Sequence, residues 1–73
     1  MMTLSEVKKG QRLWIKKVNA EDIRPQAMRL GLYEGADLEC TEAIKNGPVI
    51  LRNAFCEIAV GQKIAKNILV TVA

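Results

Sequence analysis

Apolar and polar residues alternate in short runs along most of the chain, and glycines or polar pairs separate the runs. Residues 11–18 predict the first strand, in which Leu13 and Ile15 share one face because side chains in a strand alternate with a period of two. Val18 has the opposite parity. Burial of all three apolar residues therefore predicts a β-bulge near Lys16.

A short helix is predicted directly after this strand. Pro25 is tolerated only in the first turn of a helix, so the helix begins near Ile23, with Asp22 as the expected N-cap. Gly31 supplies the C-terminal stop. The apolar face of the helix comprises Ile23, Ala27 and Leu30, which we expect in the core.

The rest of the chain predicts further strands. Residues 37–43 form the second strand, with Leu38 and Cys40 on its inner face. Turn signals then separate a strand at 49–52, an alternating strand at 56–60, a helical turn at 61–67 and a closing strand at 68–72. The sequence thus predicts a mainly β fold, a small and partly open β-barrel of about five strands, with one short helix after the first strand and a helical turn before the last.

The length of 73 residues is enough for one small domain, which we assign to residues 1–73. No apolar run approaches the ~20 residues that a membrane span needs. The start of the chain also lacks the basic and apolar regions of a secretory signal. These features predict a cytoplasmic protein.

The charge is unevenly distributed along the chain. The net charge is +3, and residues 1–33 carry seven basic and three acidic groups against four and five in residues 34–73. The first half is therefore mildly basic. It lacks the dense basic stripe of a dedicated nucleic-acid-binding protein, which argues against a nucleic-acid partner.

Residues for catalysis are scarce. The chain has no histidine, the commonest general base, and Ser5 is its only serine. The carboxylates Glu39, Glu42 and Glu57 are expected on the solvated face of a half-buried sheet. The glycines are scattered at turns and form no phosphate-binding loop. The sequence therefore predicts no enzyme, no catalytic residue and no cofactor.

The two cysteines, Cys40 and Cys56, lie within apolar stretches and outside any CxxC spacing. Together with Glu42 or Glu57 they have the chemistry to bind a soft metal ion, and a disulfide between them is a further alternative. We expect two reduced, half-buried thiols that pack in the core, and no metal site.

Four segments, in order and at matching spacings, resemble one protein family. Residues 4–11 form a leucine-led segment that ends in glycine before the first strand, and residues 28–35 are similar to the helix-exit pattern RLxxLGLxPG. Residues 46–49 match a GGP hairpin, and residues 58–70 match an ending of the form IALRxxxAxxIxV. From Leu4 to Val72 the chain resembles the FeoA family, ferrous iron transport protein A, whose members are small cytosolic SH3-like barrels.

The chain departs from the family pattern at three places. Glu34 stands where the family usually has proline, Val60 and Gly61 replace leucine and arginine, and Ala54 lies near a common glycine position. The resemblance implies one partner, the membrane transporter FeoB with its cytosolic GTP-binding domain. It also implies an accessory or regulatory role in ferrous iron uptake, with membrane contact only through that partner and with self-association left open. Because histidine is absent, we expect no tight Fe(II) binding by the isolated protein.

Two regions are candidates for partner binding. Trp14 lies on the strand face opposite Leu13, beside Lys16, and is either an exposed anchor in a basic rim or a packing residue. The helix and its exit segment form the second candidate, an apolar ledge to which a partner could dock. On this reading, Leu32→Asp weakens binding and leaves the barrel folded. The candidate partner-binding residues are Trp14, Lys16, Arg24, Met28, Leu32 and Tyr33.

Two other function classes are alternatives to the transporter-binding module. A small barrel can bind nucleic acid through basic and aromatic residues, here Arg12, Trp14, Lys16, Lys17 and Arg29. A similar barrel also occurs as the C-terminal domain of metal-dependent repressors. The start at Met1, with no helix-turn-helix before the barrel, argues against that second alternative.

Overall fold

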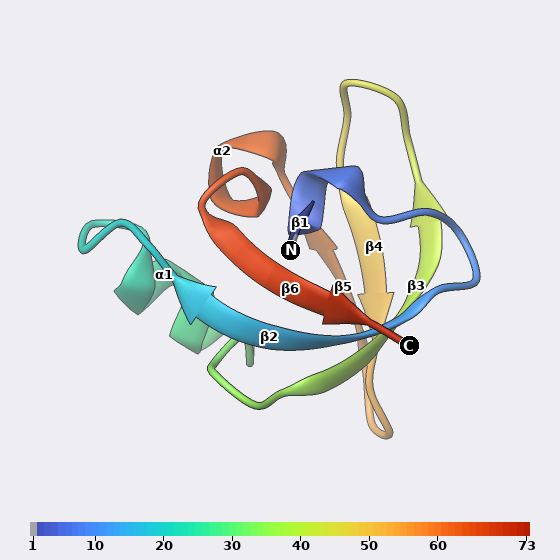
Figure 1. The fold of residues 1–73 in the computed structure, drawn as a ribbon, viewed down its shortest axis with the longest axis horizontal. Helices are drawn as coiled ribbons and strands as arrows, with labels where there is room; N and C mark the ends of the chain where they lie inside the picture. The colour runs from blue at the N-terminus through green and yellow to red at the C-terminus, as the bar shows by residue number, and fades with distance from the viewer. Residues whose placement is uncertain (1) are drawn as a thin grey trace.

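Six antiparallel strands form a single sheet in the computed structural model, which describes residues 2–73 (Figure 1). The strands lie in the order β1-β6-β2-β3-β4-β5, so β1 and β5 are the two edges and the barrel stays open between them. The elements are β1 (Met2–Thr3), the 3-10 helix η1 (Leu4–Glu6), β2 (Arg12–Val18), α1 (Arg24–Arg29), β3 (Asp37–Ala43), β4 (Val49–Arg52), β5 (Glu57–Val60), α2 (Gln62–Ala65) and β6 (Ile68–Val72).

This architecture confirms the predicted fold class. The short helix follows the first long strand, and the helical turn precedes the last strand, as expected. The sheet has six strands where about five were expected, because the two-residue β1 pairs with β6 through Met2 and Thr3. A strand of that length has too few residues for an alternating pattern to show.

The core is built from the inward faces of the strands and from residues of the helices and loops. Leu13 and Ile15 of β2 are buried, and so are Leu38 and Cys40 of β3, as their parity predicts. The helical segments add Leu4, Ala27 and Ala65, which lie completely out of solvent. Leu30 is half-buried and packs against this core.

The predicted bulge in β2 is present. Ile15 pairs with Val70 of β6, but Lys17 pairs with Leu69, so one extra residue lies between them. That shift rotates Val18 inward, where it is 3% exposed. Lys16 and Lys17, at the bulge, are both exposed. The extra residue changes the parity of the strand, so the apolar residues on both sides of the bulge face the core.

The α1 helix ends in a Schellman motif. Gly31 has φ of +82°, a left-handed conformation that glycine adopts without a Cβ clash. The N–H of Gly31 donates to the carbonyl of Met28, and the N–H of Leu32 donates to the carbonyl of Ala27. This pair of hydrogen bonds folds the chain back, so Leu32 packs beneath the helix and is completely buried.

The start of α1 differs from its expected cap. Ile23 occupies the N-cap position, with no side-chain hydrogen bond, and Pro25 lies in the first turn as predicted. Asp22 is therefore not the N-cap, and its backbone carbonyl instead accepts a hydrogen bond from Gln26 Nε2 at 3.0 Å. Burial of Ile23 against the core outweighs the capping bond that Asp22 could have made.

A candidate docking surface between helix α1 and the β4–β5 hairpin

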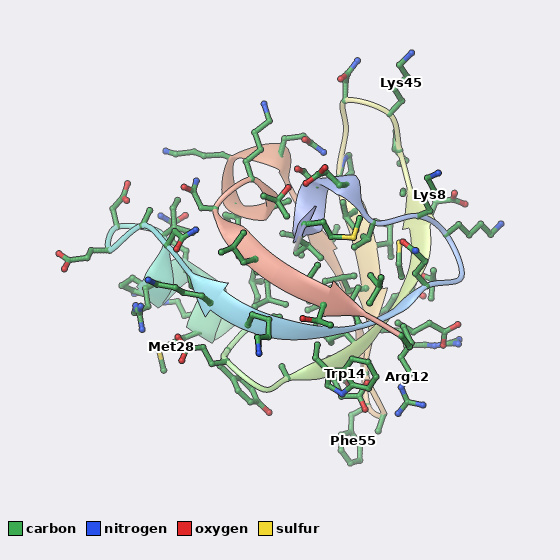
Figure 2. The ribbon with its side chains drawn as sticks, in the orientation of Figure 1. Lys8, Arg12, Trp14, Met28, Lys45 and Phe55 are labelled. Carbon is green, nitrogen blue, oxygen red and sulfur yellow. The ribbon has the colours of Figure 1, made fainter. Side chains whose placement is uncertain are left out.

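Three large apolar side chains are exposed on one side of the molecule. Met28 of α1 is 61% exposed, Tyr33 of the following loop 56% and Phe55 of the β4–β5 hairpin 96%. Figure 2 shows Met28 and Phe55 projecting outward on the same side, away from the sheet. We call Met28, Tyr33 and Phe55 the apolar rim.

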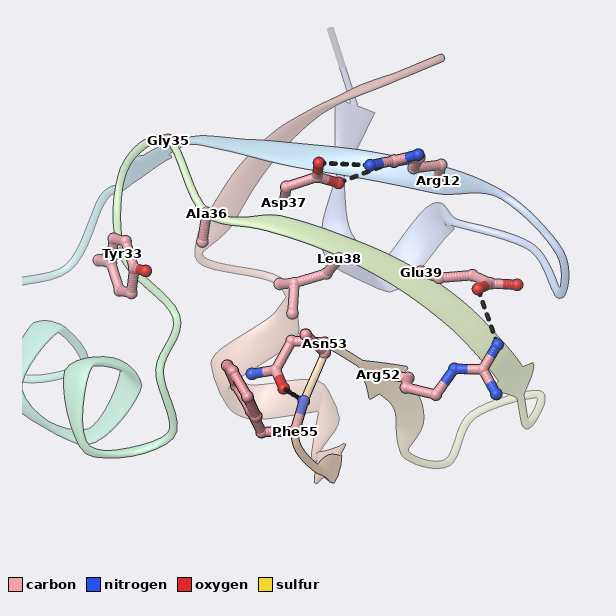
Figure 3. Close-up of a pocket in the computed structure, with 11 residues that line it drawn as sticks. Arg12, Tyr33, Gly35, Ala36, Asp37, Leu38, Glu39, Arg52, Asn53 and Phe55 are labelled. Carbon is pink, nitrogen blue, oxygen red and sulfur yellow. Dashed lines mark hydrogen bonds and ion pairs between the residues drawn. The ribbon is translucent and has the colours of Figure 1, made fainter.

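A shallow groove of about 710 Å³ separates the loop after α1 from the β4–β5 hairpin. Tyr33 borders it on the loop side and Phe55 on the hairpin side (Figure 3). Ala36 and Leu38, both almost completely buried, lie between them, and the polar side chains of Asp37 and Asn53 also line the groove. Two aromatic rings at the borders of a groove are suited to contact the side chains of another polypeptide.

A second, smaller groove of about 280 Å³ adjoins the first at Tyr33, which lines both. Met28 and Arg24 border it on the helix side, and the buried Leu32 lies beneath it. Arg24 Nη2 donates to the carbonyl of Val18 at 3.1 Å, which holds the guanidinium against the end of β2. The two grooves therefore form one continuous surface along the apolar rim.

Phe55 projects from a defined turn. The side chain of Asn53 accepts hydrogen bonds from the backbone N–H of Phe55 at 2.8 Å and of Cys56 at 2.9 Å. The N–H of Asn53 donates in turn to the carbonyl of Cys56. Because Asn53 satisfies these backbone groups, the hairpin end is an ordered Asx-type turn that presents the phenyl ring to solvent.

Two ion pairs border the larger groove at the end away from α1. Arg12 donates to both carboxylate oxygens of Asp37, at 2.9 and 2.7 Å, and Arg52 Nη2 donates to Glu39 Oε1 at 2.9 Å (Figure 3). The hydrogen bonds from Arg12 lower the pKa of the Asp37 carboxyl below its ordinary value. These pairs neutralise that end of the groove.

The structure brings some of the predicted partner-binding residues together. Met28, Tyr33 and Arg24 share the smaller groove. Trp14 is half-buried on the outer side of β2, across from Asp37 and Thr71. Lys16 is exposed on the same strand but lines neither groove.

The exposed position expected for Leu32 is wrong. Its side chain is 0% exposed, because the Schellman motif turns it under α1. The expectation that Leu32→Asp leaves the barrel folded is therefore also wrong, since the substitution places a charge in the core. A glycine followed by a leucine after an amphipathic helix is the sequence signal for this motif.

Phe55 is the residue that sequence reasoning missed. It precedes an alternating strand, so periodicity alone assigns it to a connection and says nothing of its exposure. The available signal was Asn53, two residues earlier, since asparagine at that spacing favours an Asx turn that projects the next side chains outward.

The cysteines differ from each other more than expected. Both are free, but Cys40 is buried and Cys56 is exposed, so the prediction of two half-buried thiols is wrong. Burial raises the pKa of the Cys40 thiol, whose Sγ donates to the carbonyl of Glu42. Among residues 2–73, no three His, Cys, Asp or Glu side chains gather as a metal site requires.

None of the helices in residues 2–73 has the length and apolar character needed to cross a membrane. A family model described as the FeoA domain matches residues 2–72. A comparison with curated proteins gave no significant match.

Several solved structures have the same fold. The FeoA protein of Chlorobium tepidum is 32% identical, with a TM-score of 0.80 over 97% of this chain and 70% of that one. The FeoA of Stenotrophomonas maltophilia, solved with zinc and described as a procaryotic SH3 domain protein, is 23% identical, with a TM-score of 0.78 over 97% of this chain and 91% of that one. The metal-dependent transcriptional regulator MtsR is 18% identical, with a TM-score of 0.85 over 99% of this chain but 34% of its own. The barrel is thus SH3-like, and in MtsR a similar fold forms one part of a longer protein.

Proposed function

The chain belongs to the FeoA family, which is associated with ferrous iron transport, and we propose that it is a cytoplasmic accessory protein that binds the FeoB-type transporter through the apolar rim. Under this proposal, the protein is a regulator and not an enzyme. The FeoA of Stenotrophomonas maltophilia has itself been put forward as a ferrous iron transport activating factor.

The observation that supports this proposal is the exposure of Met28, Tyr33 and Phe55 along two adjoining grooves. Small proteins rarely leave several large apolar side chains together in water unless the surface is used. Aromatic residues over a preformed groove are also typical of the residues that contribute most to binding free energy. Arg24 adds a cation at one border of the rim. Trp14 and Lys16 extend the proposed contact along β2.

Regulation by such a surface needs no chemistry of its own. If the domain binds one conformation of the transporter or of its GTP-binding domain more tightly than another, it shifts the populations of the two. A difference in binding free energy of ~1–3 kcal/mol changes the equilibrium by roughly 5- to 150-fold.

The test is a titration of the isotope-labelled domain with the GTP-binding domain of the FeoB-type transporter from the same genome, with and without nucleotide. We expect amide shifts at Met28, Tyr33 and Phe55. Phe55→Ser should raise Kd by about tenfold or more, as expected for an aromatic hot-spot residue. Ile44→Ser is the matched control, because Ile44 is 51% exposed but lines neither groove.

Equal loss of affinity in the Phe55 and Ile44 variants would show that the rim is not the contact surface. If the GTP-binding domain does not bind, the same titration is repeated with the whole transporter in lipid nanodiscs. Absence of binding there as well would refute the proposed partner.

A further inference from the structure

The β5 strand (Glu57–Val60) is an open edge of the sheet. It pairs with β4 on one side, and no described strand lies on its other side. The second edge, β1, is only two residues long. Natural sheets usually shorten, bend or cover an exposed edge, because its unpaired backbone groups can bind another chain.

The register shows which backbone groups are free. The N–H of Asn53 donates to the carbonyl of Cys56, so these two residues form a hydrogen-bonded pair of the β4–β5 ladder. Hydrogen-bonded and non-bonded pairs alternate in an antiparallel ladder. The backbone groups of Ile58 and Val60 therefore face β4, and those of Glu57 and Ala59 face away from the sheet. Within residues 2–73, no backbone bond outside the ladder uses the N–H or carbonyl of Glu57 or Ala59.

The side chains along this edge indicate the chemistry of an added strand. Glu57 and Ala59 are exposed on the outer face, whereas Ile58 is half-buried and packs against the core. Three of the sheet's carboxylates, those of Asp37, Glu39 and Glu42, have a cationic partner. Glu57 forms no ion pair among the described residues, although Arg52 lies directly across from it on β4, because the Arg52 guanidinium is bonded to Glu39. Glu57 accepts a long hydrogen bond from Thr41 Oγ1, at 3.4 Å.

From this arrangement we infer that β5 binds an extended segment of the partner protein as an additional strand of the sheet. The backbone groups of Glu57 and Ala59 would bond to it. The segment carries a lysine or arginine across from Glu57 and an apolar residue across from Ile58, where it continues the core. This inference rests on the proposed function, because it takes the transporter as the source of the segment.

A second copy of this chain fits the edge less well. In an antiparallel pairing of two β5 strands through their outward backbone groups, a ladder centred on Ile58 places Glu57 across from Ala59 of the other copy, and a ladder centred on Glu57 places it across from Glu57. Neither residue supplies a cation, since residues 57–60 contain no basic residue.

Ala59→Pro is the decisive variant. Proline removes the outward N–H and is tolerated at an edge strand, because that N–H makes no bond to β4. Ala59→Thr is the matched control, since it keeps the N–H and suits a strand. The ligand is the FeoB-type transporter from the same genome, reconstituted in lipid nanodiscs. Far-UV circular dichroism and thermal unfolding verify that both variants are folded.

We expect Ala59→Pro to raise Kd about tenfold or more and Ala59→Thr to change it less than about threefold. In wild-type protein, hydrogen exchange at the amides of Glu57 and Ala59 should be fast when the protein is free and at least about tenfold slower in the complex. This second measurement decides the question even if the proline variant fails to fold.

Binding that survives Ala59→Pro, with fast exchange at both amides in the complex, would overturn the inference and leave the proposed function intact. If the wild-type protein does not bind the transporter, the proposed function is refuted, and the inference with it. Concentration-dependent dimers in sedimentation, with both amides protected in the absence of transporter, would identify a second copy as the occupant and also overturn the inference.

Discussion

Leu32 provides the clearest quantitative test of the structure. Its side chain is 0% exposed and lies under α1, while its N–H is bonded to Ala27. Leu32→Ala keeps that backbone bond and removes three buried carbons, at ~0.8 kcal/mol each. The cavity left behind adds to this transfer cost, so the free energy of unfolding should fall by about 3 kcal/mol.

That loss is large for this chain. A domain of 73 residues has a total stability of roughly 4–11 kcal/mol. Since each kcal/mol lowers the Tm of a domain this small by ~4–8 °C, Leu32→Ala should lower it by about 12–24 °C. The measurement is urea unfolding followed by circular dichroism and by fluorescence of Trp14, the single tryptophan.

Met28→Ala is the control, because Met28 lies on the exposed side of the same helix and is 61% exposed. Its unfolding free energy should change by less than ~0.5 kcal/mol. If Leu32→Ala were equally mild, Leu32 would not be buried beneath α1 by the Schellman motif.

Three further predictions concern charge, thiols and backbone. The carboxyl of Asp37 should titrate below the ordinary value of 3.8, and Arg12→Gln should bring its pKa back toward that value in carboxyl-detected NMR. Because the folded pKa is the lower one, the stabilisation from this pair is present above pH 3.8 and is lost as the pH falls through the folded pKa. In native protein Cys56 should react with a maleimide while Cys40 stays unmodified until urea is added, since only Cys56 is exposed; labelling of both thiols at equal rates would contradict the structure. Gly31→Ala should lower the free energy of unfolding by about 1–2 kcal/mol, because φ of +82° is unfavourable for a residue with a Cβ; an unchanged urea midpoint would count against that geometry.

Much of the fold could be predicted from the sequence because the strands alternate cleanly. The parity of Leu13, Ile15 and Val18 is incompatible with a regular strand, and that conflict alone located the bulge that the β2–β6 register contains. Pro25 fixed the start of α1 in the same way, because the first turn is the part of a helix that tolerates its ring.

The candidate site was harder to predict, because its residues lie outside the periodic segments. Leu32 follows the helix, so helical spacing does not assign it to a face, and only the reversal of the chain at Gly31 buries it. The groove between Tyr33 and Phe55 depends on how a loop and a hairpin approach each other in space. No local pattern in the sequence predicts how close the loop after α1 lies to the β4–β5 hairpin.

The position of β6 (Ile68–Val72) has a consequence for folding during synthesis. This strand lies between β1 and β2, so residues near the end of the chain join two segments from its beginning. While residues 68–72 remain inside the ribosome, β1 has no strand to pair with and one side of β2 is open. Ile68 and Val70 are also missing from the core until then. The nascent chain therefore completes its sheet only after residue 72 has emerged, and we expect this long-range pairing to form slowly.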